Sequence, residues 1–202
     1  MYTLSKDMWK TKTLSKLAVL GVIAFVLMLF EFPLVWLAPP FLKLDISDLP
    51  ALIGSFALGP MAGVIIQFLK NLLFIVIRGT SSAGVGELAN FLVGSVFVYT
   101  AGAIYFRKRT MNRAVVGLIS GTILMTIVIT LANYFFIFPM YAKMFGLSIE
   151  NLVEMGTSIN ANIVDLKTMM IYAIVPFNLL KGILESAITI LVYKRVSPIL
   201  HK

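Results

Sequence analysis

The sequence predicts an all-α integral membrane protein, a bundle of six transmembrane helices with both termini in the cytoplasm. Its 202 residues are 59% hydrophobic and 13% charged, whereas soluble domains are about 45–50% apolar and about a quarter charged. The apolar runs are too long and too continuous for the strands of a membrane barrel, which alternate over roughly ten residues. A helix needs about 20 apolar residues to cross a bilayer, so residues 1–202 are expected to form one transmembrane domain.

The basic residues are distributed as a membrane topology requires. The formal net charge is +8, and most Lys and Arg side chains gather in three short segments, Lys6–Lys16, Arg107–Arg113 and Lys194–Lys202. The cytoplasmic flanks of transmembrane helices carry such an excess of basic residues. We therefore expect all three segments to lie inside the cell, and we expect no nucleic-acid partner.

Several kinds of catalysis are excluded by residues that the chain lacks. It has no cysteine, and its single histidine, His201, is next to the last residue. A metalloenzyme or a Ser-His hydrolase would need a histidine inside the bundle. The chain also lacks the Walker A pattern with which P-loop proteins bind ATP. We therefore expect neither an enzyme nor a cofactor.

The first half of the chain contains the first predicted spans. The first span runs from Leu17 to Leu37, and the charged loop FLKLDISDLP (Phe41–Pro50) follows it on the outer side. The next apolar segment, Leu49–Ile77, is interrupted at Gly59–Pro60. Its first piece is about ten residues long, or ~15 Å of helix. This leaves two interpretations open, a short crossing with its return or a re-entrant pair.

The second half contains the remaining spans. Gly79–Phe91 is a Gly/Ser-rich external turn that leads into a span ending at the basic RKR sequence. Val115–Pro139 is expected to cross back to the outside, and Tyr141–Asp165 to form a polar outer loop. The last span then runs inward to Tyr193.

Three polar side chains of the last span share one face. Asn178, Lys181 and Glu185 are spaced three and four residues apart, and Pro176 suits the first turn of a helix, so we expect the main helix to start there. An ionised group at a helix centre in a bilayer costs at least ~2.5–3.5 kcal/mol. Two hypotheses account for this cost: Lys181 and Glu185 form an ion pair within the bundle, or Asn178 and Lys181 face a ligand cavity that opens to the outside.

Other polar residues in the spans have two interpretations each. Asn133 shares a face with three threonines suited to helix packing, but it lies beside the aromatic YFF sequence, as a site for a flat heteroaromatic ligand would require. Glu87 is either a carboxylate favoured at a helix start or a cavity wall that binds donor groups. Lys70 and Asn71 form a second polar spot, which snorkelling or pairing between helices would explain without a ligand.

The outer loop ends in SDLP (Ser47–Pro50), which is typical of a helix start with a capping Ser or Asp. The loop is therefore expected to be anchored at its end. Lys43, Leu44 and Asp45 then lie over the outer ends of the fifth and sixth spans, where they would cover a pocket.

Three segments carry a family resemblance. The runs KLDISDLPALIGSFALGPMAGVIIQFLKNLL (Lys43–Leu73) and GVGELANF (Gly84–Phe91), together with PFNLLKG in the last span, resemble the riboflavin-specific substrate-binding subunits, or S components, of energy-coupling factor (ECF) transporters. The resemblance extends over essentially the whole chain. It implies high-affinity riboflavin capture by a six-helix protein in the plasma membrane of a prokaryote. It also implies three partner subunits, a transmembrane coupling subunit and two cytoplasmic ATPases.

The resemblance also assigns residues. It implies polar flavin contacts and a loop covering the ring at these positions: Asn133, Asn178, Lys181, Leu42, Lys43, Leu44 and Asp45. Family members often carry an Ala-x-x-x-Ala pattern on the first helix for contact with the coupling subunit. Here the small residues Ala18, Gly21 and Ala24 are three apart instead.

Three alternatives remain. The ligand could be flavin mononucleotide or another vitamin; a phosphate ester would need a further cation, such as Lys43 or Arg78. A small membrane enzyme acting on a lipid-linked substrate would need clustered carboxylates, and no Asp-x-x-Asp pattern occurs inside a span. A packing or signalling subunit without a ligand would leave the polar residues of the last two spans unexplained.

Overall fold

The protein is almost entirely helical in the computed structural model, which describes residues 10–80 and 82–200, and side chains as far as residue 193. Within these residues, five helical segments are long and apolar enough to cross a membrane. The all-α prediction is therefore confirmed. The five segments are α1 (Thr11–Met28), α3 (Pro60–Arg78), α4 (Val85–Phe106), the segment Met111–Phe145 and the segment Leu166–Tyr193.

The two longest segments are each built from several pieces. The segment before the outer region consists of α5 (Met111–Ala132), η2 (Asn133–Ile137) and α6 (Phe138–Phe145), and the last one of α8 (Leu166–Met169), η3 (Met170–Ile174) and α9 (Val175–Leu200). Between them lies the short helix α7 (Ile149–Thr157). A further apolar helix, α2 (Leu49–Leu58), has only ten residues.

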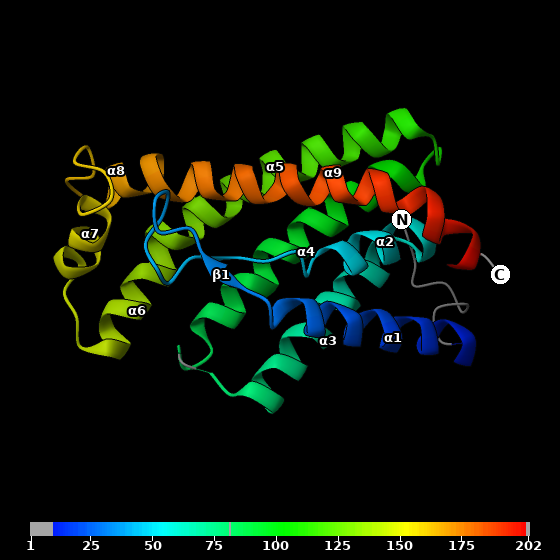
Figure 1. Ribbon diagram of the computed structural model, residues 1–202, viewed down its shortest axis with the longest axis horizontal. Helices are drawn as coiled ribbons and strands as arrows, with labels where there is room; N and C mark the ends of the chain where they lie inside the picture. The colour runs from blue at the N-terminus through cyan, green and yellow to red at the C-terminus, as the bar shows by residue number, and fades with distance from the viewer. Residues whose placement is uncertain (1–9, 81, 201–202) are drawn as a thin grey trace.

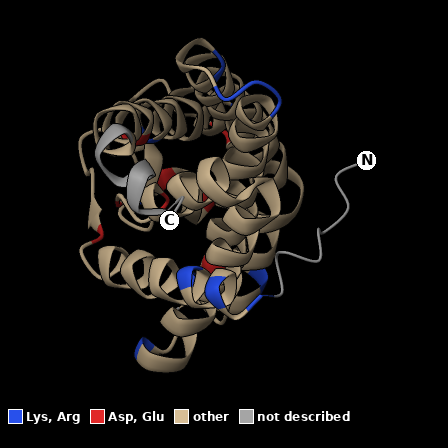
Figure 2. Cartoon of the chain, turned by 90° about the vertical axis from the view of Figure 1, so that its right-hand side faces the viewer, with Lys and Arg blue, Asp and Glu red and all other residues tan. Residues whose placement is uncertain are grey.

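The helices form an elongated bundle, with α7 and α8 at one end (Figure 1). At the opposite end, α1 begins, α9 ends and α4 connects to α5 (Figure 1). Figure 2 views the molecule from that end, with Lys and Arg residues in blue, and the start of α1 and the α4–α5 connection contribute Lys10, Lys12, Lys16, Arg107, Lys108, Arg109 and Arg113 there. Lys6 and Lys202 lie outside the described residues. For the described part, the bundle has one basic end and one end built from loops and short helices.

The first helix ends nine residues earlier than predicted. We expect a span over Leu17–Leu37 from hydropathy, but α1 covers Thr11–Met28. Pro33 and the Pro39–Pro40 pair follow it, and proline removes a helix hydrogen bond and disfavours a helical conformation in the preceding residue. The apolar residues after Met28 instead form the strand β1 (Phe32–Pro33), which pairs antiparallel with β2 (Lys43–Leu44). Hydropathy alone cannot distinguish these two outcomes.

The predicted break at Gly59–Pro60 is present. Gly59 has φ +113°, a conformation that side chains disfavour, and Pro60 starts α3 without needing an N–H partner. The chain therefore turns back sharply from α2 into α3.

Small residues allow close helix packing. A Cβ at Gly117 of α5 would lie 2.6 Å from the carbonyl oxygen of Ala101 of α4, so these two helices approach too closely for any larger residue. On α1, Gly21 and Ala24 are buried, with Gly21 against Leu69 of α3, whereas Ala18 is exposed. The small residues of α1 thus pack partly inside this chain.

Two π-helical turns carry the long helices past a proline. The turn η2 ends two residues before Pro139, and η3 ends two residues before Pro176. A proline ring clashes with the carbonyl group four residues earlier and lacks the matching N–H, and a π-turn is one local adjustment that keeps such a helix continuous. The expectation that the main helix starts at Pro176 is therefore corrected, because helical structure begins at Leu166.

Candidate functional site

A cavity of about 370 Å³ lies at the end of the bundle that carries α6 and α7. Its walls come from the loop after α1, the start of α4, the end of α5, the α6–α7 region and α9. Pockets for small ligands typically measure about 300–1,000 Å³. The volume therefore suits a single small molecule of vitamin size.

Most of the predicted site residues meet at this cavity although they are far apart in the sequence. The following predicted residues line it: Leu42, Lys43, Asp45, Glu87, Asn133, Asn178 and Lys181. Leu44 does not line it, because its side chain packs with Ala38 and Phe177 beneath the loop. Leu44 therefore supports the loop, while its neighbours form the wall.

The two asparagines present the same arrangement from neighbouring helices. The Nδ2 of Asn133 donates to the carbonyl of Ile129, and the Nδ2 of Asn178 donates to the carbonyl of Ile174, both at 2.8 Å. Among the described residues, none donates to either Oδ1. Each amide therefore keeps one acceptor and one N–H donor for a ligand. A heteroaromatic edge with adjacent donors and acceptors would match this pair.

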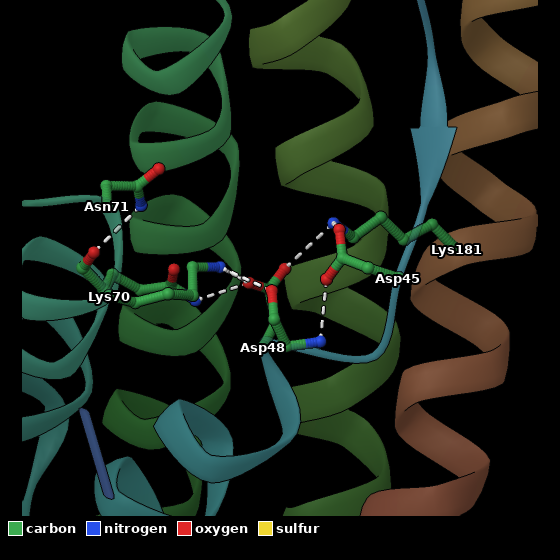
Figure 3. Close-up of polar contacts among 7 residues, drawn as sticks. Asp45, Asp48, Lys70, Asn71 and Lys181 are labelled. Atoms are coloured by element: carbon green, nitrogen blue, oxygen red, sulfur yellow. Dashed lines mark hydrogen bonds and ion pairs between the residues drawn. The ribbon is translucent and has the colours of Figure 1, made fainter. Parts of the chain in front are cut away.

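Lys181 pairs with the outer loop rather than with its own helix. Its Nζ is 3.3 Å from Oδ2 of Asp45 and 3.5 Å from Oδ2 of Asp48 (Figure 3). Within the described residues no ion pair joins Lys181 to Glu185, so the hypothesis of an i,i+4 pair in α9 is wrong. The ammonium group lies at the cavity wall and is held there by two carboxylates of the loop.

Asp48 anchors the loop deep in the bundle. Its Oδ1 accepts from Nζ of Lys70 and, at 2.7 Å, from Nε2 of Gln67, both on α3 (Figure 3). Lys70 also donates to Oγ of Ser47 at 2.9 Å. Lys70 is fully buried, which excludes snorkelling and confirms pairing between elements. Asp48 does occupy the position before α2, as predicted, but its side chain makes no cap bond to the helix.

Glu87 is both a carboxylate at a helix start and part of the cavity wall, the two roles considered for it. It lies in the first turn of α4 and lines the cavity with a buried side chain. Its Oε2 accepts hydrogen bonds from Thr80 at 3.0 Å and from Ser82 at 2.8 Å. Because both bonds go to Oε2, Oε1 remains as an acceptor for donor groups of a ligand, such as hydroxyls.

Charged residues also lie at the cavity wall beside the end of α1. Lys43 lies 2.7 Å from Oε1 of Glu31, and Arg78 lies 3.7 Å from the same atom. Glu31, which follows the end of α1, lines the cavity as well. These three side chains connect the end of α1, the strand β2 and the end of α3.

Sequence reasoning missed the wall that comes from the outer region 141–165. Phe145, Leu147, Leu152 and Met155 line the cavity from α6, α7 and the turn between them. Behind them, α7 packs against α6 and the start of the last span. The helical spacing of Ile149, Leu152 and Val153, which places them on one face of α7, was the available signal, but it does not indicate which surface the helix covers.

Comparisons with known proteins agree with this architecture. The family model "ECF transporter, substrate-specific component" matches residues 12–193. The chain is 40% identical to the riboflavin transporter RibU of Staphylococcus aureus (strain TCH60), over 97% of this chain and 96% of that protein. It is 36% identical to the riboflavin transporter FmnP of Bacillus subtilis (strain 168), over 94% of both.

A solved structure is similar as well. It is described as "Structure and mechanism of the S component of a bacterial ECF transporter" and superimposes with a TM-score of 0.71 at 39% identity. The match covers 94% of this chain and 97% of that one. The similarity therefore extends over the whole bundle, including the elements that form the cavity.

Proposed function

Because this chain belongs to the substrate-specific components of ECF transporters, we propose that it captures riboflavin outside the cell and delivers it for uptake. The protein is a transport component and not an enzyme. The observation that supports riboflavin best is the convergence of Asn133, Asn178 and Lys181 on one cavity of about 370 Å³. The relatives named riboflavin transporters support the same ligand.

The proposed binding mode divides the cavity between a polar wall and an apolar cover. The amides of Asn133 and Asn178 and the ammonium of Lys181 hydrogen-bond the polar edge of the flavin or its ribityl hydroxyls. Leu42 and the α7 residues Leu152 and Met155 cover the ring. Burial of a flat aromatic ligand between such side chains supplies most of its binding energy.

Flavin bound during expression tests this proposal. We expect the protein, purified from cells grown with riboflavin, to be yellow and to release one flavin per chain when denatured. Chromatography of the released flavin distinguishes riboflavin from flavin mononucleotide. Flavin mononucleotide is the second candidate. Lys43 lines the cavity and shares the single carboxylate of Glu31 with Arg78, so two positive charges face one negative charge and a phosphate ester would balance them. A colourless protein that releases no flavin would contradict both candidate ligands, riboflavin and flavin mononucleotide.

The ECF family implies uptake driven by partners that hydrolyse ATP, and this chain carries no Walker A pattern of its own. We expect the partners of the ECF family, a transmembrane coupling subunit and two cytoplasmic ATPases, in the plasma membrane of a prokaryote. The exposed apolar surface of the bundle suits a lipid bilayer and a membrane partner.

The proposed topology has six crossings and cytoplasmic termini. In this arrangement the short helix α2 and the chain that leads into it make the second crossing. The basic end of the bundle faces the cytoplasm, as the positive-inside rule requires (Figure 2). The cavity then opens to the outside.

Cysteine labelling tests the topology. In intact cells, an impermeant thiol reagent is expected to label cysteines introduced at Ser148 or Ser158, which are exposed at the α7 end. Cysteines at Thr11 or Asn112, at the basic end, are expected to react only after the membrane is opened. The chain has no cysteine of its own, so each variant reports one position. Labelling at Asn112 in intact cells would rule out this orientation.

A further inference from the structure

Five ionisable side chains meet beneath the cavity, and their charges do not balance. Asp45, Asp48 and Glu185 contribute three carboxyl groups, and Lys70 and Lys181 contribute two ammonium groups. All five side chains are at least 96% buried. Fully ionised, the cluster would carry one net negative charge on buried side chains, and an uncompensated buried charge is costly.

The three carboxyl groups differ in their partners. Asp45 accepts from the N–H of Ser47 at 2.7 Å and pairs with Lys181, and Asp48 pairs with both lysines. Glu185 is 0% exposed, and neither of its oxygens has a hydrogen-bond partner among the described residues. A buried carboxylate without donors is the arrangement that folded proteins avoid. The excess charge therefore lies at Glu185.

Two further acceptors of the cluster receive no hydrogen bond from the described residues. They are Oε1 of Gln67 and Oδ2 of Asp48, and the latter lies 3.5 Å from Nζ of Lys181 as an ion pair. The Gln67 amide belongs to the same cluster, because its Nε2 donates to Oδ1 of Asp48. The charged groups around Glu185 are those two aspartates and two lysines. The cluster thus lacks one positive charge and at least one donor.

We propose that this cluster is a binding site for one proton, which Glu185 carries as a neutral carboxylic acid. A proton supplies the missing positive charge and makes Glu185, whose two oxygens accept no hydrogen bond from the described residues, a neutral group. Like-charged carboxyl groups that cannot both ionise commonly hold one proton in this way.

The proton has a consequence for the cavity. Glu185 is one helical turn from Lys181 on α9, so an ionised Glu185 would compete with Asp45 for the ammonium group. With a neutral Glu185, the ammonium group of Lys181 keeps its ion pair with Asp45 and stays at the cavity wall. Glu185 is therefore a positioning residue, and the inference does not depend on the identity of the ligand.

Infrared spectroscopy tests the proposal directly. At neutral pH we expect the purified protein to show the carbonyl stretch of a buried, protonated carboxylic acid, shifted in heavy water. The band is expected to disappear in Glu185→Gln and to remain in Glu150→Gln, which changes an exposed glutamate. If Glu185→Gln does not fold, carbon-13 labelling of glutamate in the native protein shows whether the band belongs to a glutamate, and its persistence in Glu87→Gln excludes the other buried glutamate.

Two results would overturn the proposal. One is the absence of a carboxylic acid band at neutral pH. If sodium ions then raised the melting temperature of the native protein but not that of Glu185→Gln, a metal cation would supply the missing charge in place of the proton. The other is a band that persists in Glu185→Gln or does not shift with labelled glutamate.

Discussion

Replacing Lys181 with methionine is expected to lower riboflavin affinity about ten- to a hundred-fold, because a hydrogen bond to a charged group typically contributes ~1.5–3 kcal/mol. The ammonium lines the cavity and is held by Asp45 and Asp48 at 3.3 and 3.5 Å. Methionine keeps the length and the apolar stem of the side chain. The measurement is a fluorescence-quenching titration with riboflavin, made on variants whose folded state is first checked by thermal melting.

Glu185→Gln is the matched control for this variant. It changes the neighbouring residue on the same face but leaves the contacts between Lys181 and the loop intact. We expect its riboflavin affinity to change by less than about threefold, which is under 1 kcal/mol. If Glu185→Gln lost as much affinity as Lys181→Met, the polar face of α9 would act as one structural unit, and the direct contact assigned to Lys181 would be wrong.

Asp48→Asn is expected to produce the largest loss of stability. Asparagine preserves the size of the side chain but removes the charge that pairs with the fully buried Lys70 and with Lys181. Breaking a buried ion pair by removing one partner typically costs about 3–5 kcal/mol, because the remaining charge is left uncompensated. The thermal melting temperature in detergent is expected to fall markedly.

Asp165→Asn makes the same substitution at an exposed site and serves as the control. Asp165 caps α8, where the backbone N–H of Thr168 donates to its carboxylate at 2.7 Å and lowers the pKa of that carboxyl. Asparagine is an equally good capping residue, so we expect the melting temperature to stay close to that of the native protein. Equal melting temperatures for both variants would show that the buried ion cluster does not stabilise the fold.

The sequence predicts those features that depend on local patterns. Long apolar runs predict the spans, and the Gly59–Pro60 pair predicts the turn between α2 and α3. The spacing of Asn178 and Lys181 predicts a shared polar face, because helical periodicity alone places them there. These features need no knowledge of which elements are neighbours.

Features that depend on distant contacts could not be predicted in the same way. Lys181 pairs with Asp45 across 136 positions of the chain, whereas spacing indicated only Glu185. Lys70 is paired by the loop 22 residues before it, which hydropathy does not show. The early end of α1 also depends on distant contacts. Prolines end the helix within a continuous apolar run because the residues that follow are stabilised by the β1–β2 hairpin and by the ion pairs of the loop.

The central claim is that riboflavin binds in the cavity between α4, α5, α9 and the loop before α2. A fluorescence titration of the flavin-free protein with riboflavin tests it, run beside Ala89→Trp, which places a large side chain at the cavity wall. We predict quenching that saturates at one riboflavin per native chain and no saturable quenching for a folded Ala89→Trp variant. Absence of saturable binding to the native chain, or equal binding by both proteins, would contradict the claim.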